Sequence, residues 1–258
     1  MNTTLTIKNR FSDTTVMCGR VLRHTLRSVD TIITVIAMPV MMMLASVYVY
    51  GGAMDLGRVN YIDYIVPGIL LFCIVSGVAY SAVRLNNDVT KGIFERFHSM
   101  PIAKSSILGG HVLTSVLFNA VSVLAVLLVA LLIGFRPGAG IVGWLLASGI
   151  LLLFTLAMTW IAVTFGLLAK SLEGSGVFSY LLMILIFTSS AFAPTETMPA
   201  ALRYFAEVQP MTPIIDSVRS LLMTGTVSNA VWLAILWCVG IWIFFHLAAM
   251  RIYKRRIE

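Results

Sequence analysis

Six long runs of apolar residues, separated by short polar segments, make up most of the chain. The runs lie near residues 31–50, 64–83, 107–133, 141–168, 177–194 and 229–250. A helix rises about 1.5 Å per residue, so about 20 apolar residues cross a hydrocarbon core about 30 Å thick. The pattern predicts an all-α membrane protein with six transmembrane helices, because barrel strands would alternate over segments of about 10 residues.

Basic residues are distributed unevenly between the two sides of these spans, with 14 on one side and 4 on the other. The richer side holds Lys8, Arg10, Arg20, Arg23, Arg27, Arg84, Lys91, Arg96, Lys104, Lys170, Arg251, Lys254, Arg255 and Arg256, and the poorer side holds Arg58, Arg136, Arg203 and Arg219. The positive-inside rule places both termini in the cytoplasm and the chain in the cytoplasmic (inner) cell membrane.

Composition agrees with this class. Apolar residues make up 59% of the chain and charged residues 11%, against about 25% charged in a typical soluble domain. The positions of the basic residues account for the net charge of +7, so we expect no nucleic-acid partner. We expect one domain over 1–258, with a tail and pre-span helix at 1–30, a six-span bundle at 31–250 and a second tail at 251–258.

The chain lacks the residues that would let it supply its own driving force. The predicted span centres contain no Asp, Glu, Lys or Arg, which disfavours a proton- or sodium-coupled carrier. No Gly-Lys-Ser, Gly-Lys-Thr or HExxH pattern occurs. We expect no catalytic, cofactor-binding or metal-binding residues here, so uphill transport would draw its energy from another polypeptide.

Two amphipathic segments are predicted on the cytoplasmic side. In residues 16–29, Arg20, Arg23 and Arg27 fall on one helical face and aliphatic residues on the other, as in an interfacial helix. In residues 88–100 a narrow apolar stripe consists of Val89, Ile93, Phe97 and Met100, with Gly92, Glu95 and Arg96 off the stripe. Asp88 is a candidate N-cap for the second helix and Pro101 a stop signal. Taken alone, the segments also fit a topology anchor and a surface helix on lipid.

A proline-rich segment between the fifth and sixth spans is predicted to lie outside the cell. Its candidate gate residues are Pro194, Glu196, Pro199, Pro210 and Pro213. Thr197 can cap a short helix with Pro199 in its first turn. A second helix would present Ile214, Ile215, Val218, Leu221 and Leu222 on one face, with Asp216 and Arg219 opposite. Such helices fit a re-entrant cap over the external mouth, and a plain amphipathic loop is the alternative.

Several blocks of the chain, in order, resemble the type-2 family of ABC transporter permeases, in particular its daunorubicin-resistance-like branch. The blocks are the arginine-rich helix leading to Pro39, the Tyr50-Gly51-Gly52 turn, Ile65-Val66-Pro67-Gly68-Ile69-Leu70, Gly92-Ile93-Phe94-Glu95-Arg96 with Met100-Pro101-Ile102, and the two proline-bounded motifs at 193–199 and 209–214.

The resemblance implies a permease that pairs with a second, identical or different, copy and with two separate ATP-binding subunits, which bind ATP and Mg. It makes residues 88–102 a coupling helix, with Ile93 and Phe97 filling a groove on the ATPase and Glu95 and Arg96 contacting it. The helix at 16–29 becomes the connecting helix, and residues 194–224 become external re-entrant helices. Spans one and five would line the dimer interface.

The implied function is ATP-driven export of a lipophilic or amphiphilic compound, such as a drug, antibiotic or lipid. Candidate cavity residues are Ser76, Tyr80, Phe187, Thr188 and Ser189, although helix packing and backbone hydrogen bonding also account for them. Two alternatives stay open: an exporter of a glycan, polysaccharide or lipid-linked sugar within the same family, and an ATP-independent channel or facilitator.

Overall fold

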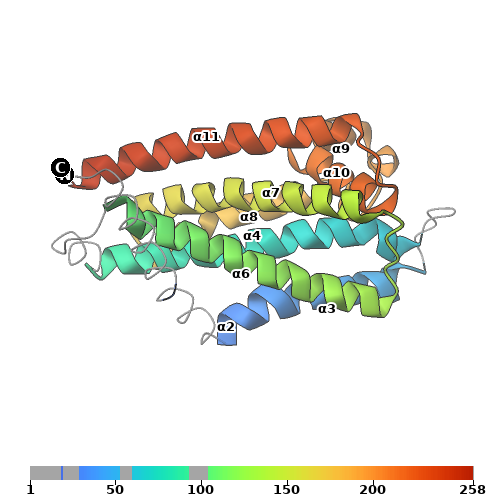
Figure 1. Cartoon of the computed structure of the whole chain (residues 1–258), viewed down its shortest axis with the longest axis horizontal. Helices are drawn as coiled ribbons and strands as arrows, with labels where there is room; N and C mark the ends of the chain where they lie inside the picture. Colours follow the sequence, from blue (N-terminus) through green and yellow to red (C-terminus); the bar gives the residue numbers. More distant parts are fainter. Residues whose placement is uncertain (1–18, 20–28, 53–59, 93–103, 258) are drawn as a thin grey trace.

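The computed structural model describes residues 19, 29–52, 60–92 and 104–257, which form helices joined by short turns. No β-strand occurs within these ranges, so the predicted all-α class is confirmed. We call the end of the bundle that carries α9 and α10 the cap end, and the end at which α11 finishes the C-terminal end (Figure 1).

The helices follow the order of the apolar runs. They are α2 (Val29–Ile32), η1 (Ile33–Ala37), α3 (Met38–Ala45), η2 (Ser46–Tyr50), α4 (Tyr61–Thr90), α6 (Lys104–Ile133), α7 (Ile141–Leu168), α8 (Leu172–Phe187), η3 (Thr195–Thr197), α9 (Ala200–Val208), α10 (Met211–Met223) and α11 (Asn229–Ile257). Within the described residues, α4, α6, α7 and α11 are long and apolar enough to cross a membrane. The apolar helices at Ile33–Val49 and Leu172–Phe187 are shorter. The first lies within predicted span one, whereas the second overlaps predicted span five (177–194) only as far as Phe187.

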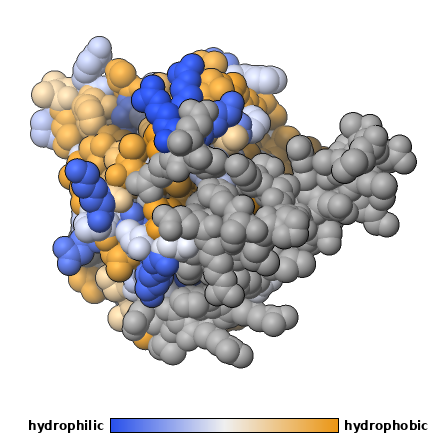
Figure 2. Space-filling view, turned by 90° about the vertical axis from the view of Figure 1, so that its left-hand side faces the viewer, coloured by the Kyte–Doolittle hydropathy of each residue, from blue (hydrophilic) through white to orange (hydrophobic). Residues whose placement is uncertain are grey.

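Helix α4 forms the centre of the bundle, with α3, α6, α7 and α8 packed around it and α11 against the far side of α7 (Figure 1). In its most apolar window, 89% of the residues are buried inside the protein, compared with 17% for α11. A helix that is apolar on all sides must be buried either by protein or by lipid. The two fractions therefore identify α4 as the protein core and α11 as a lipid-facing helix. Viewed from the C-terminal end, hydrophobic surface surrounds a few hydrophilic side chains (Figure 2).

Helix α4 is longer than the predicted second span, which corrects two details. It continues to Thr90, so Arg84 lies in the helix and Asp88 is in its last turns instead of capping a new helix. The extra turns stay helical because Leu85 is fully buried among α6, α7 and α11 side chains. The helix ends at Thr90, and Gly92 follows it with a φ of 67°, in the left-handed region that favours glycine.

The first apolar segment is a continuous helix that changes type three times, from α2 through η1 and α3 to η2. Residues Ile33–Ala37 and Ser46–Tyr50 are π-helical and flank the α-helix Met38–Ala45. Pro39 occupies the first turn of that α-helix. Proline cannot donate a backbone hydrogen bond, and a π-helical turn before it changes the bonding register so that the chain can continue as a helix.

Gly68 marks the closest approach between α4 and the turn after α8. A Cβ at this position would lie 2.7 Å from Ala191 Cβ and 2.9 Å from the Ala191 backbone. We expect Gly68→Ala to lower stability by about 1–3 kcal/mol, seen as a lower midpoint of thermal unfolding in detergent. Gly149→Ala in α7 is the matched control, because its Cβ would meet nothing within 4 Å, and alanine suits a helix better than glycine. Equal midpoints of thermal unfolding for Gly68→Ala and Gly149→Ala would contradict the close contact between Gly68 and Ala191.

Candidate functional site

Two short helices form the cap end. Pro199 is the N-cap of α9 and Pro210 the N-cap of α10. Proline suits helix starts because the first backbone N–H groups have no partner within the helix. The predicted capping by Thr197 is wrong: its hydroxyl donates to the Pro194 carbonyl (2.7 Å) within the preceding 3₁₀ turn, and Pro199 lies before the first turn of α9 instead of inside it.

The apolar face predicted for the second helix is confirmed. Ile214, Ile215, Val218, Leu221 and Leu222 are all buried, and they pack α10 against α4, α7 and α11. Pro213 lies in the first turn, where its missing N–H costs nothing. Helix α10 is therefore a fixed part of the bundle. By contrast, α9 has only Ala206 buried.

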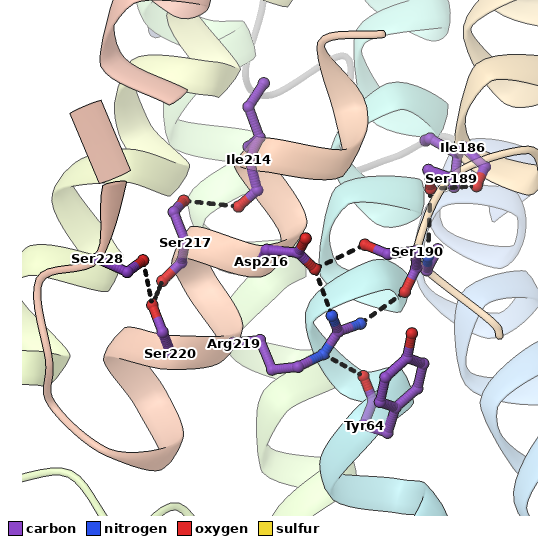
Figure 3. Close-up of polar contacts among 11 residues, drawn as sticks. Tyr64, Ile186, Ser189, Ser190, Ile214, Asp216, Ser217, Arg219, Ser220 and Ser228 are labelled. Atoms are coloured by element: carbon purple, nitrogen blue, oxygen red, sulfur yellow. Dashed lines mark hydrogen bonds and ion pairs between the residues drawn. The ribbon is translucent and has the colours of Figure 1, made fainter. Parts of the chain in front are cut away.

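The polar side of α10 forms a cluster that we call the Arg219 clamp, consisting of Arg219, Asp216, Ser190 and Tyr64 (Figure 3). Arg219 donates to Asp216 Oδ1 (2.5 Å) and to the Ser190 carbonyl (2.6 Å). It also donates to the Tyr64 carbonyl (3.2 Å), and its guanidinium carbon lies 3.9 Å from the centre of the Tyr64 ring. The Ser190 hydroxyl donates to the same Asp216 oxygen (2.7 Å). One side chain thus connects α10, α4 and the turn after α8.

The spacing of Asp216 and Arg219 in the sequence indicates part of this clamp. Asp216 and Arg219 are three residues apart, so they share a helix face, and ionisable groups in an otherwise apolar segment are expected to have partners. Their contacts with Tyr64 and Ser190 join positions far apart in the chain, and helical spacing gives no information about such contacts.

Polar contacts also fix the C-terminal end of α4. The Asp88 carboxylate and His111 Nε2 are 3.3 Å apart, which joins α4 to α6. The Asn86 amide donates to the carbonyls of Gly166 (3.0 Å) and Ala169 (2.7 Å), which joins α4 to the end of α7. The chain therefore leaves α4 and returns into α6 at anchored positions.

These anchors flank the predicted coupling helix. Val89 is half-buried in the last turn of α4, and Gly92 follows that helix. The other predicted coupling residues, Ile93, Glu95, Arg96, Phe97, Met100 and Pro101, lie outside the described residues, as do Arg20, Arg23 and Arg27 of the predicted connecting helix.

The five candidate cavity residues lie in α4 and around the end of α8. Ser76 donates its hydroxyl to the Phe72 carbonyl within α4, and Thr188 and Ser189, which follow α8, donate theirs to the carbonyls of Ile184 and Ile186 in its last turn. The Phe187 ring stacks on Phe192 and meets Phe72 edge-on at the cap end. Tyr80 lies nearer the C-terminal end and donates to the Thr34 hydroxyl (3.0 Å).

Tyr80 does line a groove between α4 and α8. The groove has a volume of about 330 Å³, and its walls are Ala79, Tyr80, Val83, Leu172, Glu173, Gly176, Ser179 and Tyr180. Its open, mostly apolar form resembles a site for a lipophilic molecule more than a catalytic centre. No group of three or more metal-ligating side chains occurs in the described part of the chain.

Comparison with known proteins identifies the architecture. Residues 13–223 match the family described as ABC-2 type transporter. The chain belongs to this family. It is 30% identical over 229 residues to the daunorubicin resistance ABC transporter permease protein DrrB1 of Streptomyces coeruleorubidus. The matched region covers 87% of this chain and 80% of that protein. It is also 25% identical over 232 residues to the probable doxorubicin resistance ABC transporter permease protein DrrC of Mycobacterium tuberculosis. Here the matched region covers 89% of this chain and 84% of that protein.

Membership makes this chain an ABC transporter permease: a multi-pass membrane subunit that transports and is not an enzyme. It also confirms the resemblance that the sequence blocks indicated, including the drug-resistance-like branch. The long apolar helices are therefore membrane helices of a permease.

Proposed function

We propose that this permease is the membrane subunit of an ATP-driven exporter that moves a lipophilic or amphiphilic compound out of the cell. The observation that carries the proposal is the 30% identity with a daunorubicin resistance permease over 87% of the chain. Six membrane helices, with α3 and α8 completing the four long ones, and cytoplasmic termini fit both the apolar helices and the distribution of basic residues.

A separate ATP-binding subunit would drive the cycle by pushing on residues 88–102. The contacts of Asn86 and of Asp88 with His111 support this role, because they join the start of that segment to α6 and α7. A push on the segment would then move the bundle as a rigid body instead of bending one helix. In the complex, ATP and Mg would be bound by the partner, Ile93 and Phe97 would fill its groove, and Glu95 and Arg96 would form charge-assisted contacts.

A second permease copy would complete the transport pathway. The shorter apolar helices, predicted spans one and five, carry exposed large side chains, including Met41, Tyr48, Leu181 and Ile184. Pairing through these helices would bring two α4–α8 grooves toward one central path. The cap helices, held by the Arg219 clamp, would close that path on the external side.

The α4–α8 groove is our candidate cargo site. Its aliphatic and aromatic walls suit an apolar or amphiphilic molecule, which could enter from the inner leaflet. A glycan or lipid-linked sugar exporter of the same family would need polar groups along the path, and Ser179 and Glu173 are the polar side chains here besides the two tyrosines.

Co-purification tests this proposal. The tagged permease, extracted in mild detergent from its native host, should carry ATP-binding subunits at equal stoichiometry, identified by mass spectrometry. A preparation without any ATPase, under conditions that preserve other ABC complexes from the same membranes, would contradict the proposal and favour the facilitator.

A further inference from the structure

The outward face of α11 carries two arginines at one end of a long apolar stripe. Arg251 and Arg255 are four residues apart, so they lie on the same side of the helix, and both are exposed. Together with Phe244, Leu247, Ala248 and Ile252 they line a hollow of about 330 Å³. The opposite side of the helix, with Ala249 and Tyr253, is buried against α6 and α7.

The stripe continues from the hollow along the membrane-spanning part of α11. Leu233, Trp237, Phe244 and Leu247 are exposed on this side, and helical periodicity places them in line with Arg251. Gly240 lies within the stripe, and a Cβ there would meet no atom within 4 Å. The surface is therefore shallow in the middle and lined by large apolar side chains on both sides of the glycine.

The position of the arginines matches a membrane surface. Arg251 lies about 33 Å along the helix axis from Asn229, the first residue of α11, at 1.5 Å per residue. This distance is close to the thickness of the hydrocarbon core. With Asn229 at one interface, Arg251 and Arg255 lie at headgroup level of the other.

The charge at this site is uncompensated by the described part of the chain. The carboxylates of Asp88, Glu207 and Asp216 contact basic side chains on other helices, and none of these contacts reaches Arg251 or Arg255. Two neighbouring cations at headgroup level attract anionic lipid, and arginine binds phosphate through paired N–H groups.

We propose that this face of α11 is a binding site for an anionic phospholipid of the leaflet at the C-terminal end. The phosphate lies between Arg251 and Arg255, and an acyl chain runs along Phe244 and Leu247 toward Gly240. The proposal rests on the membrane placement of the permease and does not depend on ATP coupling. It can therefore fail while the exporter proposal stands, and the converse also holds.

The test is native mass spectrometry of the full-length permease, taken from nanodiscs of equal phosphatidylglycerol and phosphatidylcholine content. We expect the wild type to retain phosphatidylglycerol preferentially. The Arg251→Gln/Arg255→Gln variant should lose this preference by about 25-fold, because each basic residue contributes roughly fivefold near an anionic surface. The Arg251→Lys/Arg255→Lys variant keeps both charges and should retain most of the preference.

The matched control is Lys91→Gln/Lys170→Gln, which removes two exposed basic residues from other elements at the same end of the bundle. It should retain lipid as the wild type does. Equal loss in this control, or unchanged phosphatidylglycerol retention in the double arginine variant, would overturn the proposal. Displacement of the lipid by excess inorganic phosphate would reduce the site to an anion site and also overturn it. A lipid-free dimer that the arginine variant abolishes would assign the face to a second copy instead.

Discussion

Replacing Arg219 with methionine is expected to destabilise the permease by about 1–3 kcal/mol, or roughly 2–12 °C in the unfolding midpoint. Methionine preserves the length of the side chain but removes every donor. The carboxylate of Asp216 and the carbonyls of Ser190 and Tyr64 would then lose a partner in a partly buried site. A buried carbonyl left unpaired costs its desolvation free energy, whereas water can partly solvate the Asp216 carboxylate, which is 40% exposed. Thermal unfolding in detergent, followed by circular dichroism, measures the effect.

The chain supplies a matched control on the same side of the bundle. Arg203 and Glu207 also form an ion pair (2.7 Å), but both side chains are 47% exposed, whereas Arg219 is 18% and Asp216 40% exposed. Arg203→Met should therefore cost less than about 1 kcal/mol. Arg219→Lys should fall between the two, because an ammonium can pair with Asp216 but cannot reproduce the planar fork. Equal midpoints for Arg219→Met and Arg203→Met would show that the clamp does not hold α10.

The Arg96→Glu/Phe97→Asp variant is expected to abolish ATP-dependent export and to lose the co-purifying ATPase. It reverses a charge and places a carboxylate where an apolar side chain would enter the partner's groove. Burying an unpaired carboxylate costs several kcal/mol, and each 1.4 kcal/mol weakens binding tenfold. The measurement is the amount of ATP-binding subunit per permease after affinity purification, together with drug efflux from cells.

The control for this pair is Leu168→Asp/Lys170→Glu, which makes equivalent changes at two exposed positions, the last residue of α7 and the turn that follows it. This control should express and bind the ATPase as the wild type does. Survival of both export and co-purification in the Arg96→Glu/Phe97→Asp variant would show that residues 88–102 are not the coupling element.

The positions of the membrane helices could be predicted because a bilayer requires a minimum length of apolar helix. The runs containing Leu70, Val126, Phe154 and Cys238 all lie in helices that meet that requirement. Helix ends were less predictable. Leu85 extends α4 past the apolar run through contacts with α6, α7 and α11 that only the fold provides, and for the same reason Asp88 pairs with His111 instead of capping a helix.

The candidate site likewise has features that could be predicted from the sequence and features that could not. The buried face of α10 follows from helical periodicity and could be predicted from the spacing of Ile214, Val218 and Leu221. The partners of Arg219 could not, because Tyr64 lies 155 residues away in the chain. Ser76 bonds within its own helix, as serines in membrane helices commonly do, and Ser189 bonds back to the last turn of α8. Residue type alone did not predict these hydrogen bonds, and a cavity role for the two serines stays a prediction.

The most direct test of the central claim is daunorubicin movement in proteoliposomes that contain the permease and its ATP-binding subunit, followed by the drug's own fluorescence. We predict uptake into vesicles whose ATP sites face outward, and only when ATP, Mg and both proteins are present. Uptake that persists without ATP or without the ATP-binding subunit would contradict the account and identify the permease as a facilitator. An absence of uptake in a complex that hydrolyses ATP would contradict the drug as cargo and favour a glycan or lipid substrate.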